Sequence, residues 1–571
     1  MSDHYAPTYA EIYQHSIAKR DDFWMQAAAA LDWYTAPTRA IDEATQHVSG
    51  QWFPDGVLNT SYNALDRHVV AGHGERAALI YDSAMTGTRK VYSYRELLDE
   101  VARLAGAMTT LGVITGDRVV IYLPMIPEAV IAMLACARIG AIHSVVFGGF
   151  AAAELAARID DAQPRVLLTA SGGLEPGRIV EYLPTVAKAL SLSASPPEIL
   201  VVKDRDQVPG AAGDYDGWRD WDTLTEGAEP VDAVPVTATH PLYILYTSGT
   251  AGKPKGVVRD HGGHAVALNW SMKHIYNIGP AEVMWAASDV GWVVGHSYIV
   301  YGPLLAGATT VMYEGKPVDT PNAGAFWRIA AEYRVKVLFT APTALRAIRK
   351  ADPHADELAH YDLPRLETLF AAGERLDPDT YHWATTTLSI PVIDHWWQTE
   401  TGWAVCANPR GIETLPVKAG SPSVTMPGFQ VEVLDAKGDP VPAGTEGYIV
   451  IALPLPPGTL SGLWRDDDRF HTSYLRIYPG YYSTGDSGYL DDDGYLFVLG
   501  RSDDVINVAG HRLTTGVMES ILAAHPAVAE NAVIGIHDDL KGQRPSAYVV
   551  PNSKFDGDTD QLRTDLIAMV R

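Results

Sequence analysis

Residues 246–256 combine small residues, hydroxyls and cations in a pattern that suits phosphate binding. The segment reads Tyr-Thr-Ser-Gly-Thr-Ala-Gly-Lys-Pro-Lys-Gly and follows an apolar run, residues 241–245, that predicts a buried strand. Glycines let backbone N–H groups turn toward a ligand, and the hydroxyls with Lys253 and Lys255 supply further donors. It is not a Walker P-loop, because Pro254 rather than Ser or Thr follows Lys253. Taken on its own, the segment could instead be a solvated glycine-rich turn that binds no phosphate.

Four further segments follow this loop along the chain. They are Phe-Ala-Ala-Gly-Glu at 370–374, Asp-His-Trp-Trp-Gln-Thr-Glu-Thr-Gly at 394–402, Tyr-Ser-Thr-Gly-Asp at 482–486, and Gly-Arg-Ser-Asp-Asp-Val-Ile-Asn at 500–507 with Gly-His-Arg at 510–512. Together the five segments resemble the motifs of the adenylate-forming superfamily. The superfamily includes acyl-CoA synthetases, luciferases and peptide-synthetase adenylation domains. Residues 9–62 also resemble the N-terminal extension of acetyl- and propionyl-CoA synthetases. The resemblance implies that ATP activates a carboxylate as an acyl-adenylate, which a thiol then attacks, with catalysis mostly by positioning and charge stabilisation.

The resemblance implies a nucleotide site built from all five segments. The implied phosphate ligands are Thr247, Ser248, Gly249, Thr250, Gly252 and Lys253. The implied adenine and ribose neighbours are Gly373, Glu374, Asp394, His395, Trp396, Gln398, Asp486 and Arg501, with Trp396 stacked on adenine and Asp486 on the ribose. Thr399 is implied at the α-phosphate, Arg512 at phosphate, and Glu400 at Mg²⁺, a hard ion that prefers carboxylate oxygen. We expect the catalytic set to be Thr247, Lys253, Thr399, Glu400 and Arg512.

The chemistry of these residue types fits the implied roles, and each also has an ordinary alternative. A carboxylate accepts from both ribose hydroxyls, and a guanidinium offers paired donors and stays charged. The alternatives are a turn-forming Asp486 before Gly488, surface ion pairs for Arg501 and Arg512, and a solvated charge for Glu374. For the two adjacent tryptophans the alternative is a place in the core of a chain with 14 Trp.

The implied acyl pocket is short and favours propionate. It consists of Val293, Val294, Ala372 and Trp397, with Trp397 as its floor. Acetate-specific relatives tend to have Val where Ala372 stands, so this chain has room for one more carbon. Residues 175–178 and 259–264 also resemble propionyl-CoA synthetases. Because one methylene discriminates by about 1–3 kcal/mol, some acetate activity is expected to persist, and acetyl-CoA synthetase is the alternative.

Four positions carry roles that only the resemblance implies. Arg178 and Gly510 are expected to contact coenzyme A, with an exposed arginine as the alternative for Arg178. Asp503 is the expected hinge about which a small domain turns, with a plain linker residue as the alternative. His525 aligns with a structural metal position, although a lone His before Pro526 is more often an ordinary surface residue.

The apolar pattern predicts an α/β fold. Apolar runs alternate with helix-like segments, which predicts parallel-rich sheets with helices on both faces; they lie at 119–122, 144–147, 166–169, 199–202, 309–313 and 335–340. Short β-type runs at 430–434 and 447–451 predict a β-rich subdomain. We expect an N-terminal extension (1–62) packed on a large domain (63–502), and a small mobile α+β domain (503–571).

The last residues predict an interrupted domain. Residues 560–571 have a helical apolar spacing that ends without a cap. The resemblance implies a further stretch with a lysine loop that contacts carboxylate and phosphate, and no matching segment follows. We therefore expect a C-terminal truncation, with a catalytically impaired nucleotide-binding fragment as another alternative.

Composition limits the partners and the compartment. The 571 residues exceed one ordinary core, and the formal charge of −25 without a long basic run argues against nucleic acid or an anionic membrane as partner. Two cysteines, Cys136 and Cys406, argue against a disulfide framework or a cysteine zinc site. The N-terminus lacks a basic stretch before an apolar run. We expect a cytoplasmic enzyme whose partners are ATP, Mg²⁺, a short carboxylate and coenzyme A, with its oligomeric state open.

Overall fold

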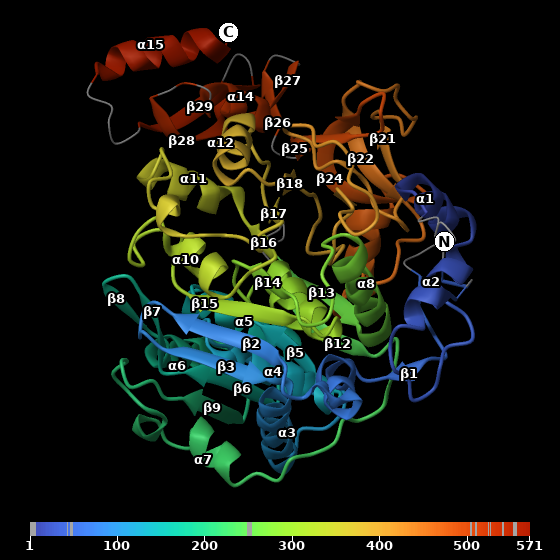
Figure 1. Ribbon diagram of the computed structural model, residues 1–571, viewed down its shortest axis with the longest axis vertical. Helices are drawn as coiled ribbons and strands as arrows, with labels where there is room; N and C mark the ends of the chain where they lie inside the picture. Colours follow the sequence, from blue (N-terminus) through green and yellow to red (C-terminus); the bar gives the residue numbers. More distant parts are fainter. Residues whose placement is uncertain are drawn as a thin grey trace.

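The α/β fold predicted from the sequence is confirmed by the computed structural model (Figure 1). The structure describes residues 7–42, 44–45, 50–247, 254–502, 505–508, 511–523, 525, 527–538, 542–551 and 557–570. Within these residues, two large sheets carry most of the chain and two four-stranded sheets follow toward the C-terminus. The loop 248–253 and the positions Asp503 and Gly510 lie outside the described residues.

The first large sheet has eight strands. Its order is β10 (Arg219–Asp220), β9 (Ile199–Lys203), β6 (Val166–Ala170), β4 (Arg118–Tyr122), β5 (Ile142–Val145), β12 (Pro241–Thr247), β13 (Lys255–Asp260) and β23 (Gly462–Leu463). Strands β10 to β12 pair in parallel, whereas β13 pairs antiparallel with β12 and β23. β5 ends at Val145, two residues before the end of the predicted run. β12 ends at Thr247 and β13 begins at Lys255, so these strands flank the predicted phosphate loop in the sequence.

The second large sheet has seven strands. Its order is β18 (Val392–Asp394), β17 (Thr368–Ala371), β16 (Val337–Thr340), β14 (Val283–Ala286), β15 (Thr309–Glu314), β2 (Ala77–Ser83) and β3 (Arg89–Ser93). All pairs are parallel except β2 with β3. The motifs at 370–374 and 394–402 leave the carboxyl ends of the neighbouring strands β17 and β18, the edge at which open α/β sheets bind ligands.

Helices accompany both sheets, and two of them are buried on nearly every side. α4 (Pro127–Arg138) is apolar around most of its circumference, as expected of a helix enclosed in a core. α8 (His261–His274) is also mostly buried, but its buried residues include His261, His264 and Ser271. α3 begins at a capping box in which Ser93 and Glu96 satisfy each other's backbone N–H groups. The other helices of the large sheets are α5 (Ala152–Ala162), α6 (Leu183–Leu192), α7 (Trp221–Glu226), α9 (Gly302–Leu305), α10 (Ala325–Glu332), α11 (Pro342–Ala351), α12 (Pro378–Leu388) and α13 (Asp467–Phe470), and α3 spans Tyr94–Thr110.

The N-terminal residues form the two expected helices, α1 (Tyr9–Ala18) and α2 (Arg20–Ala28). α2 packs on α8 (Figure 1) through a cluster of tryptophans. Trp24 of α2 is fully buried, with its ring about 6 Å from those of Trp52, Trp270 and Trp403. This aromatic contact joins the first helices to Trp403, which directly follows the motif at 394–402.

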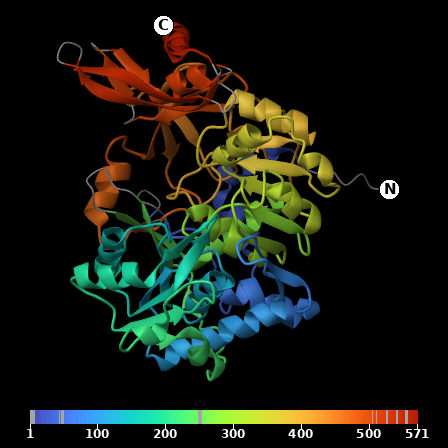
Figure 2. The same cartoon turned by 90° about the vertical axis from the view of Figure 1, so that its left-hand side faces the viewer.

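Two smaller antiparallel sheets complete the described chain. The first is β21 (Val431–Leu434), β22 (Gly447–Ala452), β24 (Tyr481–Leu490) and β25 (Leu496–Arg501), which confirms the predicted β-rich subdomain. The second is β27 (His511–Thr514), β26 (Val505–Val508), β29 (Gly542–Pro551) and β28 (Val528–Asp538), which packs with α14 (Thr515–Ala523) and α15 (Thr559–Val570) at one end of the molecule (Figures 1 and 2). Short two-stranded pairs are β1 (Val57–Leu58) with β11 (Val236–Thr237), β7 (Gly172–Glu175) with β8 (Arg178–Glu181), and β19 (Cys406–Ala407) with β20 (Val424–Thr425).

Candidate active site

A cavity of about 310 Å³ brings together residues from four separated motifs. It lies where the ends of β17 and β18 face strands β24 and β25. Nine residues predicted from the sequence line it: Gly373, Glu374, Asp394, His395, Trp396, Trp397, Gln398, Asp486 and Arg501. Six others that the sequence did not single out line it as well: Arg375, Gly420, Pro422, Val498, Leu499 and Gly500.

Asp486, on β24, is a buried carboxylate held by donors from another segment. It is 7% exposed and accepts hydrogen bonds from Gln398 Nε2 at 2.7 Å and Trp396 Nε1 at 3.2 Å. Burial raises the pKa of Asp486 to about 6, against the opposing effect of Arg501, whose Nη1 lies 3.7 Å from its Oδ1. Tyr482 in turn donates to Gln398 Oε1 at 3.0 Å. The turn-residue alternative for Asp486 is therefore wrong, since the residue lies within a strand and faces the cavity.

Asp394 and His395 anchor the next segment in the core. Asp394 accepts from the backbone N–H of Leu376 at 3.2 Å, and burial raises its pKa to about 7. His395 is 1% exposed, with Nδ1 2.7 Å from the carbonyl oxygen of Ala371 and Nε2 3.0 Å from the Tyr276 hydroxyl. Burial lowers the pKa of His395 to about 4, so the ring is neutral. These two residues fix the start of the segment.

The adjacent tryptophans have different surroundings, as predicted. Trp396 directs its N–H to Asp486, while Trp397 packs edge-on against Tyr298 at 5.6 Å and lies 6.1 Å from Phe339. Nε1 of Trp397 is buried and has no hydrogen-bond partner among the described residues. Both indoles also line the cavity, so they are not simply core residues.

Glu400 is a mostly buried carboxylate next to Lys255, from the predicted phosphate segment, and Tyr474, which lies in none of the motifs. Tyr474 donates to Glu400 Oε1 at 2.6 Å, and Lys255 Nζ lies 3.7 Å from the same oxygen. Burial lowers the pKa of Lys255, and its ammonium lies 4.6 Å from the centre of the Tyr474 ring. One buried carboxylate near a phosphate loop suits Mg²⁺, which takes one or two protein carboxylates together with substrate phosphates.

Gly373 and Glu374 form an exposed lip of the cavity. Gly373 has a φ of +103°, a conformation that favours glycine, and a side chain added there would meet open space. Glu374 accepts from the backbone N–H of Thr343 at 2.6 Å and from Arg346 Nη2 at 2.6 Å. It is therefore an ion-paired residue of the lip, and not the freely solvated charge of the alternative.

The phosphate and coenzyme A predictions are described only in part. Ser248, Gly249, Thr250, Gly252 and Lys253 lie outside the described residues, as do Gly510 and Asp503. Thr247 ends β12, and its buried Oγ1 has no partner among described residues. Arg512 lies on β27, and its side chain is not described.

The predicted acyl residues share one apolar core, and Arg178 lies on a second cavity. Val293, Val294 and Trp397 pack against the large core cluster to which Ala372 belongs. A cavity of about 770 Å³ nearby is lined by Trp292 and Arg178, among others. The Arg178 side chain is 67% exposed and pairs with Glu175 at 2.6 Å. This position fits both interpretations of Arg178, as a residue that contacts coenzyme A and as an ordinary exposed arginine.

His525, the residue at the predicted structural metal position, has a local backbone contact. The Nδ1 of His525 accepts from the backbone N–H of Ala527 at 3.1 Å. Over the described ranges, no group of three His, Cys, Asp or Glu side chains is arranged to hold a metal ion. No helix in the same ranges has the length and apolarity needed to cross a membrane.

Comparison with known proteins places the chain in a family. Residues 66–464 match the family model of AMP-binding enzymes. The chain belongs to the AMP-binding enzyme family. Residues 9–64 of the chain match the acetyl-coenzyme A synthetase N-terminus, and residues 517–571 match the AMP-binding enzyme C-terminal domain. The expected C-terminal truncation is therefore not supported, because this last segment has the pattern of the family's C-terminal domain.

Named relatives narrow the activity. The chain is 49% identical over 569 residues to human acyl-CoA synthetase short-chain family member 3, mitochondrial, with 99% of this chain and 82% of the relative covered. It is 45% identical over 550 residues to the propionate–CoA ligase of Escherichia coli, with 95% and 86% covered. The acetoacetyl-CoA synthetase structure from Streptomyces lividans matches with a TM-score of 0.88 at 28% identity, covering 100% of this chain and 86% of that one. This synthetase is an AMP-forming short-chain acyl-CoA synthetase that uses ATP, Mg²⁺ and coenzyme A.

Proposed function

We propose that the enzyme joins propionate to coenzyme A, forming propionyl-CoA, AMP and pyrophosphate through a propionyl-adenylate. The observation that carries this proposal is Ala372, a small residue 5% exposed that precedes the cavity lip Gly373-Glu374 and belongs to the core on which Trp397 packs. A larger residue at this position would fill space that an extra methyl group needs. The printed name of the Escherichia coli relative supports the same substrate.

The proposal places the nucleotide in the cavity of about 310 Å³. Trp396 stacks on adenine, Gly373 and Glu374 border its edge, and the Asp486 carboxylate accepts from the ribose hydroxyls. Arg501 lies beside Asp486 and contacts ribose or phosphate. The remaining ligands in this proposal are Thr247, Ser248, Gly249, Thr250, Gly252, Lys253, Thr399 and Arg512 for the phosphates, with Asp394, His395 and Gln398 supporting the site.

Charge stabilisation is the main task of the proposed site. Mg²⁺, held by Glu400, supplies charge neutralisation for the triphosphate. The cations of the loop, Arg501 and Arg512 stabilise the charge that moves to the leaving pyrophosphate and later to AMP. Val293, Val294, Ala372 and Trp397 surround the acyl chain, and Trp397 limits its length.

Thioester formation completes the proposed reaction. Arg178 and Gly510 contact coenzyme A, and the small domain turns about Asp503 between the two half-reactions. We also propose three domains, with boundaries at 1–62, 63–502 and 503–571. The enzyme is proposed to be cytoplasmic, and His525 is proposed to take part in a structural metal site. The human relative is called mitochondrial, so fractionation of cells producing this chain is the test of its location.

Pyrophosphate release with acetate, propionate and butyrate tests the proposal. We expect the highest kcat/KM with propionate, with acetate lower by about tenfold or more. Mass spectrometry of the thioester formed with coenzyme A identifies the product. If kcat/KM is higher with acetate, the enzyme is an acetate–CoA ligase of the same class and not a propionate–CoA ligase. Pyrophosphate release that does not depend on a carboxylate would contradict the ligase reaction itself.

A further inference from the structure

Arg259 is a fully buried arginine that reaches a distant part of the active site. It lies on β13 with no exposed surface. Its Nη1 donates to the carbonyl oxygen of Glu400 at 2.8 Å, and its Nη2 donates to the carbonyl oxygen of Thr399. These residues lie 141 and 140 positions further along the chain. One planar guanidinium therefore spans two successive carbonyls of the motif that we assign to phosphate and metal.

The guanidinium of Arg259 donates to neutral groups. Its third partner is the Tyr243 hydroxyl, which accepts from Nε at 3.1 Å. These three hydrogen-bond partners are all neutral. The buried carboxyl of the adjacent Asp260 also interacts electrostatically with Arg259: burial raises the pKa of Asp260 to about 7, and Arg259 opposes that rise. The direction of the guanidinium is therefore set by its hydrogen bonds, and arginine stays charged at any ordinary pH.

The backbone after Glu400 is shaped to lie against the guanidinium. Gly402 has a φ of +74°, and a side chain added there would lie 2.8 Å from Arg259 Cζ. Its carbonyl oxygen accepts from Ser297 Oγ at 2.7 Å. The loop from Thr399 to Gly402 is therefore held along its backbone by Arg259 and Ser297 together.

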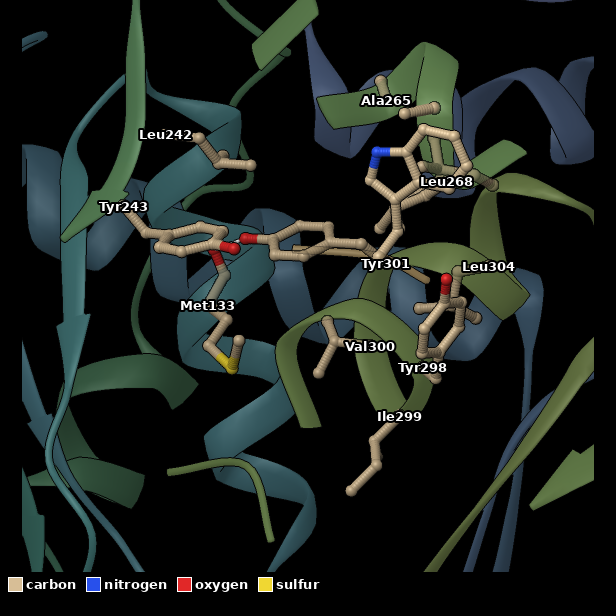
Figure 3. Close-up of a cluster of buried hydrophobic side chains, with 14 of the residues drawn as sticks. Met133, Leu242, Tyr243, Ala265, Leu268, Tyr298, Ile299, Val300, Tyr301 and Leu304 are labelled. Carbon is tan, nitrogen blue, oxygen red and sulfur yellow. Dashed lines mark hydrogen bonds between the residues drawn. The ribbon is translucent and has the colours of Figure 1, made fainter. Parts of the chain in front are cut away.

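Arg259 itself has a rigid support. Tyr243 lies in a buried cluster in which its hydroxyl end faces that of Tyr301 (Figure 3). The Tyr243 ring also packs 4.6 Å from His296 and 5.4 Å from His143. A close-packed aromatic cluster offers few alternative rotamers. The guanidinium therefore has a fixed position from which to hold the loop.

We propose that Arg259 is a positioning residue for adenylate formation, which rests on the function proposed above. By fixing the carbonyls of Thr399 and Glu400, it sets the backbone from which the Thr399 hydroxyl and the Glu400 carboxylate extend toward phosphate and Mg²⁺. The carboxylate has its own contacts with Tyr474 and Lys255, so loss of Arg259 leaves these in place while the backbone beneath them relaxes. The effect should fall on kcat and on the Mg²⁺ requirement more than on the KM for the carboxylate.

The variants Arg259→Lys and Arg259→Met test this, with Arg138→Lys as the matched control. Arg138 is also buried, but it pairs with Asp66 and donates to the carbonyl of Val231, away from the site. We expect Arg259→Met to lower kcat for pyrophosphate release by about a hundredfold, and Arg259→Lys by about tenfold, because one ammonium cannot span both carbonyls. Both should raise the Mg²⁺ concentration needed for half-maximal rate, whereas Arg138→Lys should lower only the Tm.

Hydrogen exchange gives a readout that does not depend on activity. Peptides covering residues 396–404 should exchange faster in Arg259→Lys than in the parent, while exchange of the core strands is unchanged. The proposal would be overturned if folded Arg259→Lys had the same exchange in this segment, the same kcat and the same Mg²⁺ dependence as the parent. If Arg259→Met does not fold, the result with Arg259→Lys decides whether the proposal holds. A parent enzyme without carboxylate-dependent pyrophosphate release would instead refute the proposed function, leaving the exchange measurement to judge the loop contact.

Discussion

Gln398 donates a hydrogen bond of 2.7 Å to the carboxylate of Asp486, although 88 residues separate them in the chain. Trp396, two residues earlier, donates to the same carboxylate oxygen at 3.2 Å. These contacts fix the direction of the Asp486 side chain without using all its acceptor capacity, because a carboxylate has about four lone-pair sites. The carboxylate is therefore oriented, and still able to accept from a ligand that enters the cavity.

Asp486→Asn should weaken nucleotide binding by about tenfold or more, because an amide loses the charge-assisted bonds to the ribose hydroxyls. Calorimetry with ATP and with 2′,3′-dideoxy-ATP forms a double-mutant cycle. The loss should be large for ATP and small for the dideoxy nucleotide. Equal losses for both nucleotides would show that the carboxylate does not contact the ribose.

Nucleotide binding should weaken as the pH falls through about 6. Burial raises the pKa of Asp486 to about 6 in the free enzyme, so below that pH the carboxyl is protonated and loses part of its acceptor capacity. Adenosine is the suitable ligand, since it carries no group that titrates there. The parent should lose affinity by up to about tenfold per pH unit below about 6, and Asp486→Asn should show a flat profile. A parallel decline in both proteins would assign the titration to another group.

Glu400→Gln should raise the Mg²⁺ concentration needed for activity and lower kcat by about a hundredfold or more, because a neutral amide is a weak ligand for a hard ion. Rates measured across a Mg²⁺ titration at saturating ATP provide the test. Tyr474→Phe is the matched control, because it removes one hydrogen bond to Glu400 and keeps the carboxylate. The assignment of Glu400 fails if the two variants shift the Mg²⁺ dependence equally.

Ala372→Val should shift the substrate preference from propionate toward acetate. The added methyl groups occupy space in a position that is 5% exposed, and one methylene is worth about 1–3 kcal/mol, or roughly 10- to 200-fold in the ratio of kcat/KM values. The ratio of kcat/KM for the two acids measures the change. An Ala372→Ser variant, of similar size, should leave the ratio nearly unchanged. If the ratio is unchanged in Ala372→Val, the assignment of Ala372 to the acyl pocket is wrong.

His395 should make the fold less stable in acid. Its pKa of about 4 in the folded protein lies below the unfolded value near 6.5, so its neutral form stabilises the fold fully above about pH 6.5, and this is lost as the pH falls toward 4. Over that range the contribution amounts to roughly 3 kcal/mol at most. Urea unfolding of the parent and of His395→Gln at several pH values isolates the contribution of His395 to the free energy of unfolding, because the contributions of other titrating groups cancel in the difference between the two proteins. The stability difference between the two should shrink toward acid pH; a constant difference would contradict a buried neutral His395.

Much of the fold follows from local pattern. Apolar runs such as 166–169 and 199–202 appear as the strands β6 (Val166–Ala170) and β9 (Ile199–Lys203), because strands buried on both faces are apolar throughout. The resemblance also located nine of the residues that line the cavity. In contrast, the expected C-terminal truncation is not supported, because residues 517–571 match the family's C-terminal domain, and a helix without a cap does not show that a domain is interrupted.

The sequence alone determined the residue types, the order of the motifs and the alternation of strands and helices, because these depend on short-range periodicity and composition. Only the tertiary structure decided that Tyr474 and Lys255 meet at Glu400, and that Arg259 lies beneath Thr399. Neither Tyr474 nor Arg259 has a local pattern that indicates its distant partner. Such contacts depend on how β13, the helical turn His471–Leu475 and the loop after β18 are brought together by packing of the whole core. That packing is a property of many residues at once.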